Sequence, residues 1–143
     1  EYLDLNGKPL ALNALASGQL VLVHLTVSAA DRIPDALVTD LLPAGLELEN
    51  QNLASSSASL SESAANVQEL MTDMQQVSIK HIEFRDDRFV AAIDVDGYRP
   101  AELLYLARAV TPGNYQVPAP QVESMYVPQW RATGETPARL TVR

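Results

Sequence analysis

The sequence predicts an all-β protein, an antiparallel two-sheet β-sandwich with one inserted amphipathic helix. Short apolar and β-branched runs recur along the 143 residues, turn residues separate them, and the hydrophobic pattern changes to a helical period only once. Many short strands with a single helix are typical of a sandwich in which the helix covers a sheet or an open edge. The length fits one domain, which we expect to cover residues 1–143.

The first part of the chain carries clear strand and turn signals. Asn6-Gly7 lies between short leucine-containing runs and favours a hairpin, because both residues suit the positive φ of a tight turn. The densest strand signal is LVLVHLTV at Leu20–Val27. It is apolar on both faces in its first half, so it should be a central strand. A further strand is expected over residues 36–42, ended by the Pro-Ala-Gly at 43–45.

One amphipathic helix is predicted over about Leu60 to Gln76. Ser59 followed by Glu62 fits a capping box, and apolar residues recur at steps of four and three on one helical face. This periodicity argues against reading the serine-rich residues 55–63 as a linker. The residues expected to pack against the core are Val67, Leu70, Met71 and Met74.

Strand periodicity returns after the helix. Residues 79–84 and 89–95 form a predicted hairpin with a charged tip, Arg85 to Arg88, whose role as a solvated turn or a partner contact stays open. Further strands are expected over residues 103–110, 114–117 and 140–142.

Composition excludes several classes of function. The chain has no cysteine, which excludes disulfides, thiol catalysis and a thioester formed within it. A net charge of -8 opposes binding to nucleic acid, which is a polyanion. No apolar run approaches the roughly 20 residues of a membrane span, so direct membrane insertion is not expected. The start lacks a targeting signal, and we expect a segment of a longer protein.

The sequence offers no convincing metal or catalytic site. Asp94 to Gly97 suggests a calcium loop, but Ala92 and Leu103 occupy the first and last ligand positions and cannot bind the ion. An acidic turn is the better interpretation. His24 and His81 lack a glycine-framed nucleophile and His-x-x-x-His spacing, so neither catalysis nor a cofactor is expected.

Met125 and Tyr126 lie in a proline-rich stretch. Proline fixes φ and removes a donor, so such a stretch makes a poor strand and a stiff loop that loses little entropy on docking. Two interpretations remain open: the pair contacts a partner, or Tyr126 and Trp130 close the end of the sandwich. The residues that would support the loop are Pro118, Pro120, Pro128 and Trp130.

Four segments carry a family resemblance. They are residues 40–47 (DLLPAGLE), 81–89 around RDDR, 105–115 with ARAVTPG, and 123–126 with the Met-Tyr pair. Together they resemble the C-terminal, receptor-binding-like domain of bacterial alpha-2-macroglobulins, and enterobacterial members in particular. The resemblance covers most of the chain, and the first segment combined with ARAVTPG and the Met-Tyr pair is quite specific.

The resemblance implies a macroglobulin-like sandwich at the C-terminal end of a large periplasmic endopeptidase inhibitor, lipid-anchored to the inner membrane. In such proteins a protease cuts a bait segment, and a Cys-Gln thioester in another domain is exposed and couples to the attacker. The resemblance further implies that Met125 and Tyr126 form a lock loop over that thioester. The expected partners are the thioester domain of the same parent and, through the parent, target proteases.

Two other functions compete with this interpretation. A free-standing extracytoplasmic sandwich that binds a protein or glycan is compatible with the fold, because folds of this type host many functions. A small hydrolase is disfavoured because no framed nucleophile accompanies a histidine.

Overall fold

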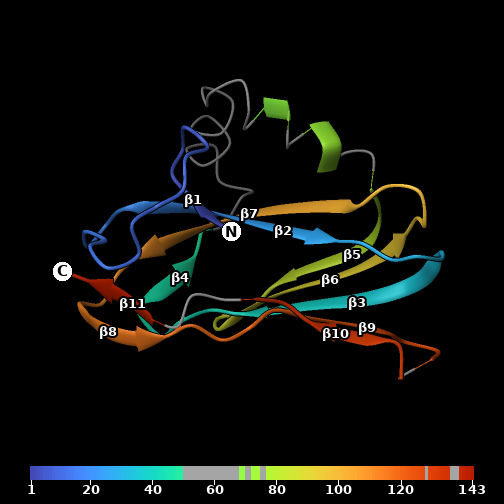
Figure 1. Cartoon of the computed structure of the whole chain (residues 1–143). Helices are drawn as coiled ribbons and strands as arrows, with labels where there is room; N and C mark the ends of the chain where they lie inside the picture. Colours follow the sequence, from blue (N-terminus) through green and yellow to red (C-terminus); the bar gives the residue numbers. More distant parts are fainter. Residues whose placement is uncertain (50–67, 70–71, 75–76, 128, 136–138) are drawn as a thin grey trace.

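The computed structural model describes residues 1–49, 68–69, 72–74, 77–127, 129–135 and 139–143. Two antiparallel sheets face each other across the core, and a two-stranded ribbon lies beside the C-terminus at one end (Figure 1). The predicted all-β sandwich is confirmed.

The strand orders define the three sheets. The four-stranded sheet runs β1 (Tyr2–Leu3), β2 (Leu20–Val27), β7 (Ala101–Ala109) and β4 (Leu46–Leu48). The five-stranded sheet runs β10 (Arg131–Thr133), β9 (Gln121–Ser124), β3 (Ile33–Leu41), β6 (Arg88–Val95) and β5 (Ser78–Phe84). The ribbon pairs β11 (Arg139–Val142) with β8 (Gly113–Gln116).

The four-stranded sheet is buried on both faces in its middle. Val21 and Val23 of β2 face the core between the sheets, whereas Leu22 packs on the outer face with Leu104 and Leu106 of β7. This explains why the sequence of β2 is apolar at consecutive positions, and it confirms that β2 is an inner strand.

A helical segment covers that outer face. Residues 68–69 and 72–74 are helical and lie above β2 and β7 in Figure 1. Met74 packs against both apolar clusters, and its sulfur accepts a hydrogen bond from the Leu104 N–H at 3.4 Å. The prediction of Met74 as a packing residue is therefore confirmed. Val67, Leu70, Met71 and most of the predicted helix over residues 60–76 lie outside the described residues.

Among the described residues, a tyrosine and an aspartate link the two sheets through the core. The Tyr105 hydroxyl of β7 donates to Asp40 Oδ2 of β3 at 2.5 Å, and Asp40 is only 2% exposed. The Tyr105 ring stacks on Phe89 with centroids 4.6 Å apart. Burial raises the pKa of the Asp40 carboxyl, and burial together with the Asp40 charge raises the pKa of the Tyr105 hydroxyl.

Two of the segments that carry the family resemblance meet in the fold. A Cβ added at Gly45 would lie 2.3 Å from the Tyr115 ring, so the ring requires a glycine there. The Tyr115 hydroxyl donates to the carbonyls of Thr111 and Pro112 at 2.9 and 3.1 Å. Tyr115 thus packs between the Pro-Ala-Gly and Thr-Pro-Gly turns, which the Val110 N–H also joins by donating to the Gly45 carbonyl at 2.9 Å.

The largest difference from the sequence prediction lies after residue 120. A stiff loop was predicted there, but Gln121–Ser124 and Arg131–Thr133 form strands β9 and β10. The flanking prolines led to the wrong prediction, because proline is rare inside strands. The four residues of β9 contain no proline, and they pair with β3. In the described part of the chain, no helix has the length and hydropathy that crossing a membrane would require.

Candidate functional site

Met125 and Tyr126 lie at the tip of a hairpin rather than in an irregular loop. Strand β9 pairs with β3 on one side and with β10 on the other, and the connection between β9 and β10 carries both residues. Figure 1 shows this tip projecting from the end of the sandwich opposite the C-terminus. The sheet therefore fixes the base of the tip, and the tip itself extends beyond the sandwich.

The tip concentrates exposed apolar surface. Met125 is 46% exposed, Tyr126 75% and Trp130 49%, and only Phe84 and Tyr98 join them as exposed large hydrophobic side chains among the described residues. Exposed apolar groups gathered at one point indicate a contact surface, whereas isolated ones need no explanation. Tyrosine and tryptophan suit such a surface because each has an apolar body and a polar group.

Hydrogen bonds hold the tip in one shape. The Ser124 N–H donates to the Trp130 carbonyl at 2.8 Å, and the Trp130 N–H donates to the Val127 carbonyl at 2.9 Å. The Ser124 hydroxyl, in a residue that is 5% exposed, accepts from the Val127 N–H at 3.2 Å. Sequence reasoning missed Ser124, because a serine after an alternating run has no distinctive signal.

The predicted supporting prolines lie in different places. Pro118 and Pro120 are half-buried in the link between β8 and β9, at the base of the hairpin. The Pro120 carbonyl accepts from the Gly134 N–H at 2.8 Å, and a Cβ on Gly134 would lie 2.8 Å from Pro120 Cγ. Pro128 lies outside the described residues. In the described contacts, Trp130 and Ser124 hold the tip and Pro120 holds the base.

The two histidines pair with carboxylates. His24 Nε2 lies 2.5 Å from Glu102 Oε2, and His81 Nε2 lies 2.9 Å from Glu83 Oε1. The Thr26 hydroxyl lies near His24 but donates to Glu102 at 2.9 Å, so it is not directed at the imidazole as a nucleophile would be.

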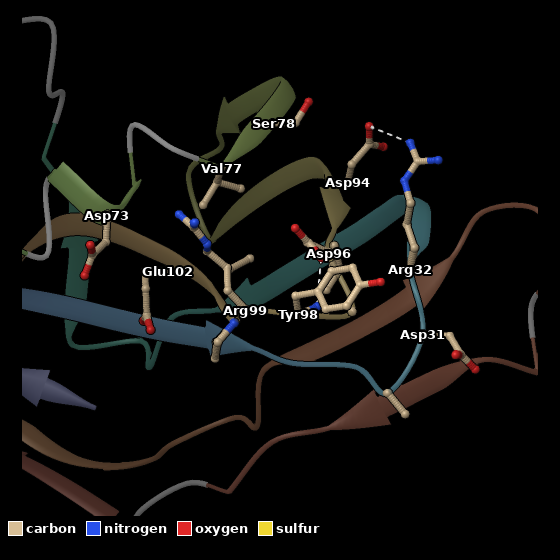
Figure 2. Close-up of a pocket in the computed structure, with 15 residues that line it drawn as sticks. Asp31, Arg32, Asp73, Val77, Ser78, Asp94, Asp96, Tyr98, Arg99 and Glu102 are labelled. Carbon is tan, nitrogen blue, oxygen red and sulfur yellow. Dashed lines mark hydrogen bonds and ion pairs between the residues drawn. The ribbon is translucent and has the colours of Figure 1, made fainter.

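A groove lies at the same end of the sandwich as the tip. Figure 2 shows its lining, which includes Arg32, Asp94, Asp96 and Tyr98. The Tyr98 N–H donates to Asp96 Oδ1 at 2.8 Å, and Arg32 pairs with Asp94 at 3.8 Å. The carboxylates of the predicted acidic turn thus interact with groups of the protein itself. The described residues contain no group of three or more His, Asp or Glu arranged to bind a metal.

Comparison with known proteins gives the family. Residues 1–129 match the bacterial alpha-2-macroglobulin MG10 domain. The chain is 67% identical over 141 residues to alpha-2-macroglobulin of Escherichia coli K12, covering 99% of this chain and 8% of that protein. The chain therefore spans only a small part of this relative's length.

Solved structures agree with the sequence match. The crystal structure of trypsin-activated alpha-2-macroglobulin from E. coli superposes with a TM-score of 0.92 at 67% identity, covering 99% of this chain and 10% of that one. Salmonella alpha-2-macroglobulin reacted with methylamine superposes with a TM-score of 0.89 at 58% identity, covering 99% and 9%. The predicted macroglobulin-like sandwich and family resemblance are confirmed: this chain belongs to the bacterial alpha-2-macroglobulin MG10 domain family.

Proposed function

We propose that this chain is the C-terminal domain of a bacterial alpha-2-macroglobulin that inhibits endopeptidases. In this proposal the tip between β9 and β10 covers a thioester in a neighbouring domain and protects it from premature hydrolysis. One observation carries the proposal: two large, partly apolar side chains, Met125 and Tyr126, are exposed on a tip whose backbone is held by its own hydrogen bonds.

The states in which related proteins have been crystallised are consistent with this chemistry. The E. coli relative has been activated by trypsin, and the Salmonella relative has been reacted with methylamine. A small amine attacks an activated acyl group, and a thioester is such a group. Because this chain has no cysteine, the thioester would belong to another part of the parent protein.

The tip can contribute only a moderate bias toward the closed state. Burying a methionine and a tyrosine stabilises a contact by roughly 1.5 to 3 kcal/mol each at most. After the entropic cost of ordering is subtracted, the population of the closed state would exceed that of the open state by a factor of about 10² to 10³. A preformed tip keeps those costs low, and a bias of this size can be reversed when a protease cuts the parent elsewhere.

The shielding itself has a simple physical basis. Water and amines attack a thioester only if they reach its carbonyl carbon, and an apolar cover excludes both. The aromatic ring of Tyr126 supplies area, and Met125 adapts its shape because its side chain is unbranched and flexible.

The proposed setting follows from the family resemblance. The partners are the thioester domain of the same parent and, through the parent, the target proteases. The parent would be periplasmic and lipid-anchored to the inner membrane. Membrane fractionation of the source cells, before and after release of lipoproteins with detergent, tests this location.

A photo-crosslinking experiment tests the function. A benzophenone amino acid replaces Tyr126 in the full-length parent, and crosslinked peptides are identified by mass spectrometry. The proposal predicts crosslinks to the thioester-bearing domain before protease addition and their loss afterwards. The same replacement at Phe84, which lies beside the charged hairpin tip of residues 85–88, is the control and should not crosslink to that domain. Crosslinks from residue 126 to a separate protein or to glycan would instead support the independent binding module.

A further inference from the structure

Strand β3 contains a bulge next to the tip. Ile33 lies opposite Val95 and Ala36 opposite Ile93, so two residues of β3 face the single residue Asp94 of β6. Asp35 at this bulge has φ of 56°, and among the described residues it is the one non-glycine with positive φ. A left-handed aspartate costs free energy, so the surroundings must stabilise it.

Both the backbone N–H and the side-chain carboxylate of Asp35 have a partner. Its N–H donates to Asp94 Oδ1 at 3.0 Å, and its carboxylate pairs with Lys80 of β5. Lys80 also lies 3.2 Å from Asp94 Oδ1, and Arg32 lies 3.8 Å from Asp94 Oδ2. The Asp35 N–H lowers the pKa of Asp94, and the Asp35 carboxylate raises the pKa of Lys80. Figure 2 shows Asp94 and Arg32 reaching toward each other beside the groove.

The carbonyl of Asp35 connects this network to the tip. It accepts a hydrogen bond from the Met125 N–H at 3.1 Å. Regular pairing of β3 with β9 ends at Ala36 and Ser124, so this bond extends the ladder by one residue beyond the strand end. Among the described residues, it is the last backbone hydrogen bond to β3 before the chain reaches Tyr126 at the tip.

We propose that Asp35, held in its left-handed conformation by Asp94 and Lys80, is a positioning residue that fixes the backbone of Met125. The bulge turns the Asp35 carbonyl toward β9, and the Met125 N–H bound to it sets the direction in which the tip side chains project. The proposed consequence for the thioester rests on the lock function described above, whereas the positioning of Met125 does not.

The test uses three variants at two aspartates. Asp94→Ala removes the acceptor of the Asp35 N–H and one partner of Lys80. Asp94→Asn keeps an oxygen acceptor without the charge. Asp96→Ala is the matched control, because Asp96 is two residues away and bonds Tyr98 rather than Asp35.

The first measurement is amide hydrogen exchange of this 143-residue chain by NMR. Asp94→Ala should speed exchange at the Met125 amide by about 5-fold, the equivalent of about 1 kcal/mol for one lost hydrogen-bond partner. Asp94→Asn should restore most of the protection, and Asp96→Ala should leave it unchanged. Met125 protection that is equal in wild type and Asp94→Ala, or lost equally in Asp96→Ala, would overturn the proposal.

The second measurement is methylamine incorporation by the full-length parent. Asp94→Ala should react faster than wild type, by up to about 5-fold, and Asp96→Ala at the wild-type rate. Suppose that Asp94→Ala speeds amide exchange at Met125, but that methylamine incorporation stays at the wild-type rate both in Asp94→Ala and when Met125 and Tyr126 are replaced. The positioning proposal then stands and the lock function fails. If replacing the tip residues speeds incorporation while Asp94→Ala changes neither readout, the lock function stands and the positioning proposal fails.

Discussion

Tyr105→Phe is expected to destabilise the sandwich by an amount that depends on pH. The substitution removes the hydroxyl that donates to Asp40 Oδ2 at 2.5 Å but keeps the ring that stacks on Phe89. Asp40 is 2% exposed, so water cannot easily replace the lost donor. A hydrogen bond to a charged group contributes about 1.5 to 3 kcal/mol, and one between neutral groups about 0.5 to 1.5 kcal/mol.

The sign of the pH effect follows from Asp40. Burial raises its pKa above the unfolded value of about 3.9, while the Tyr105 hydroxyl and the N-terminal ammonium act in the opposite direction. The stability contributed by this raised pKa is fully present below the unfolded pKa and is lost as the pH rises through the folded pKa. The Asp40 charge also acts on Tyr2: burial and this charge both raise the pKa of the Tyr2 hydroxyl.

Above the folded pKa of Asp40, the Tyr105 hydroxyl therefore offsets part of the cost of burying the ionised carboxylate. Tyr105→Phe should cost about 1.5 to 3 kcal/mol there, and about 0.5 to 1.5 kcal/mol once the pH is low enough to protonate Asp40. Urea unfolding at both pH values, at unchanged m-value, measures the difference. Tyr115→Phe is the control, because its hydroxyl bonds only backbone carbonyls and its cost should not change with pH. A cost of Tyr105→Phe that is constant or grows on acidification would refute the reasoning.

Three further outcomes are expected. Ser124→Ala removes the acceptor of the Val127 N–H and should speed amide exchange at Val127 by about 5-fold, with the global unfolding midpoint nearly unchanged; unchanged exchange would show that the tip is held by other contacts. Gly45→Ala forces the Tyr115 ring to move and should lower the free energy of unfolding in urea by about 1 to 3 kcal/mol; in a Tyr115→Ala background, where the ring is absent, the same substitution should have little further effect. The isolated chain should neither cleave peptides nor protect substrates from endopeptidases, and stoichiometric inhibition by it would contradict the assignment.

Sequence patterns predicted the sandwich because its inner strands have strong local signals. The first half of Leu20–Val27 is apolar on both faces, and the structure buries Val21 and Val23 in the core and packs Leu22 in the outer cluster that also contacts Met74. The hairpin of β5 and β6 was equally readable from its alternation and charged turn. Strands β9 and β10 were missed because they have four and three residues, and their stability comes from pairing with β3 and with each other.

The candidate site was only partly readable. Met125 and Tyr126 were singled out by their prolines and by family resemblance, and the structure exposes both at a hairpin tip. Asp35 and Asp94 could not be predicted, because a left-handed aspartate at a bulge depends on partners that are 45 and 59 residues away in sequence. Long-range contacts of this kind leave no periodic signal in the chain.

The lifetime of the thioester in the full-length parent tests the central claim most directly. Replacing Met125 and Tyr126 together with glycine should leave the domain folded, because both side chains are exposed. If the tip supplies the proposed bias, thioester hydrolysis and methylamine incorporation before any protease is added should accelerate, by up to about 10² to 10³. Asp86→Ala with Asp87→Ala, at the distant hairpin tip, is the control and should keep the wild-type rate. A double-glycine variant that retains its thioester with the wild-type lifetime would contradict the account.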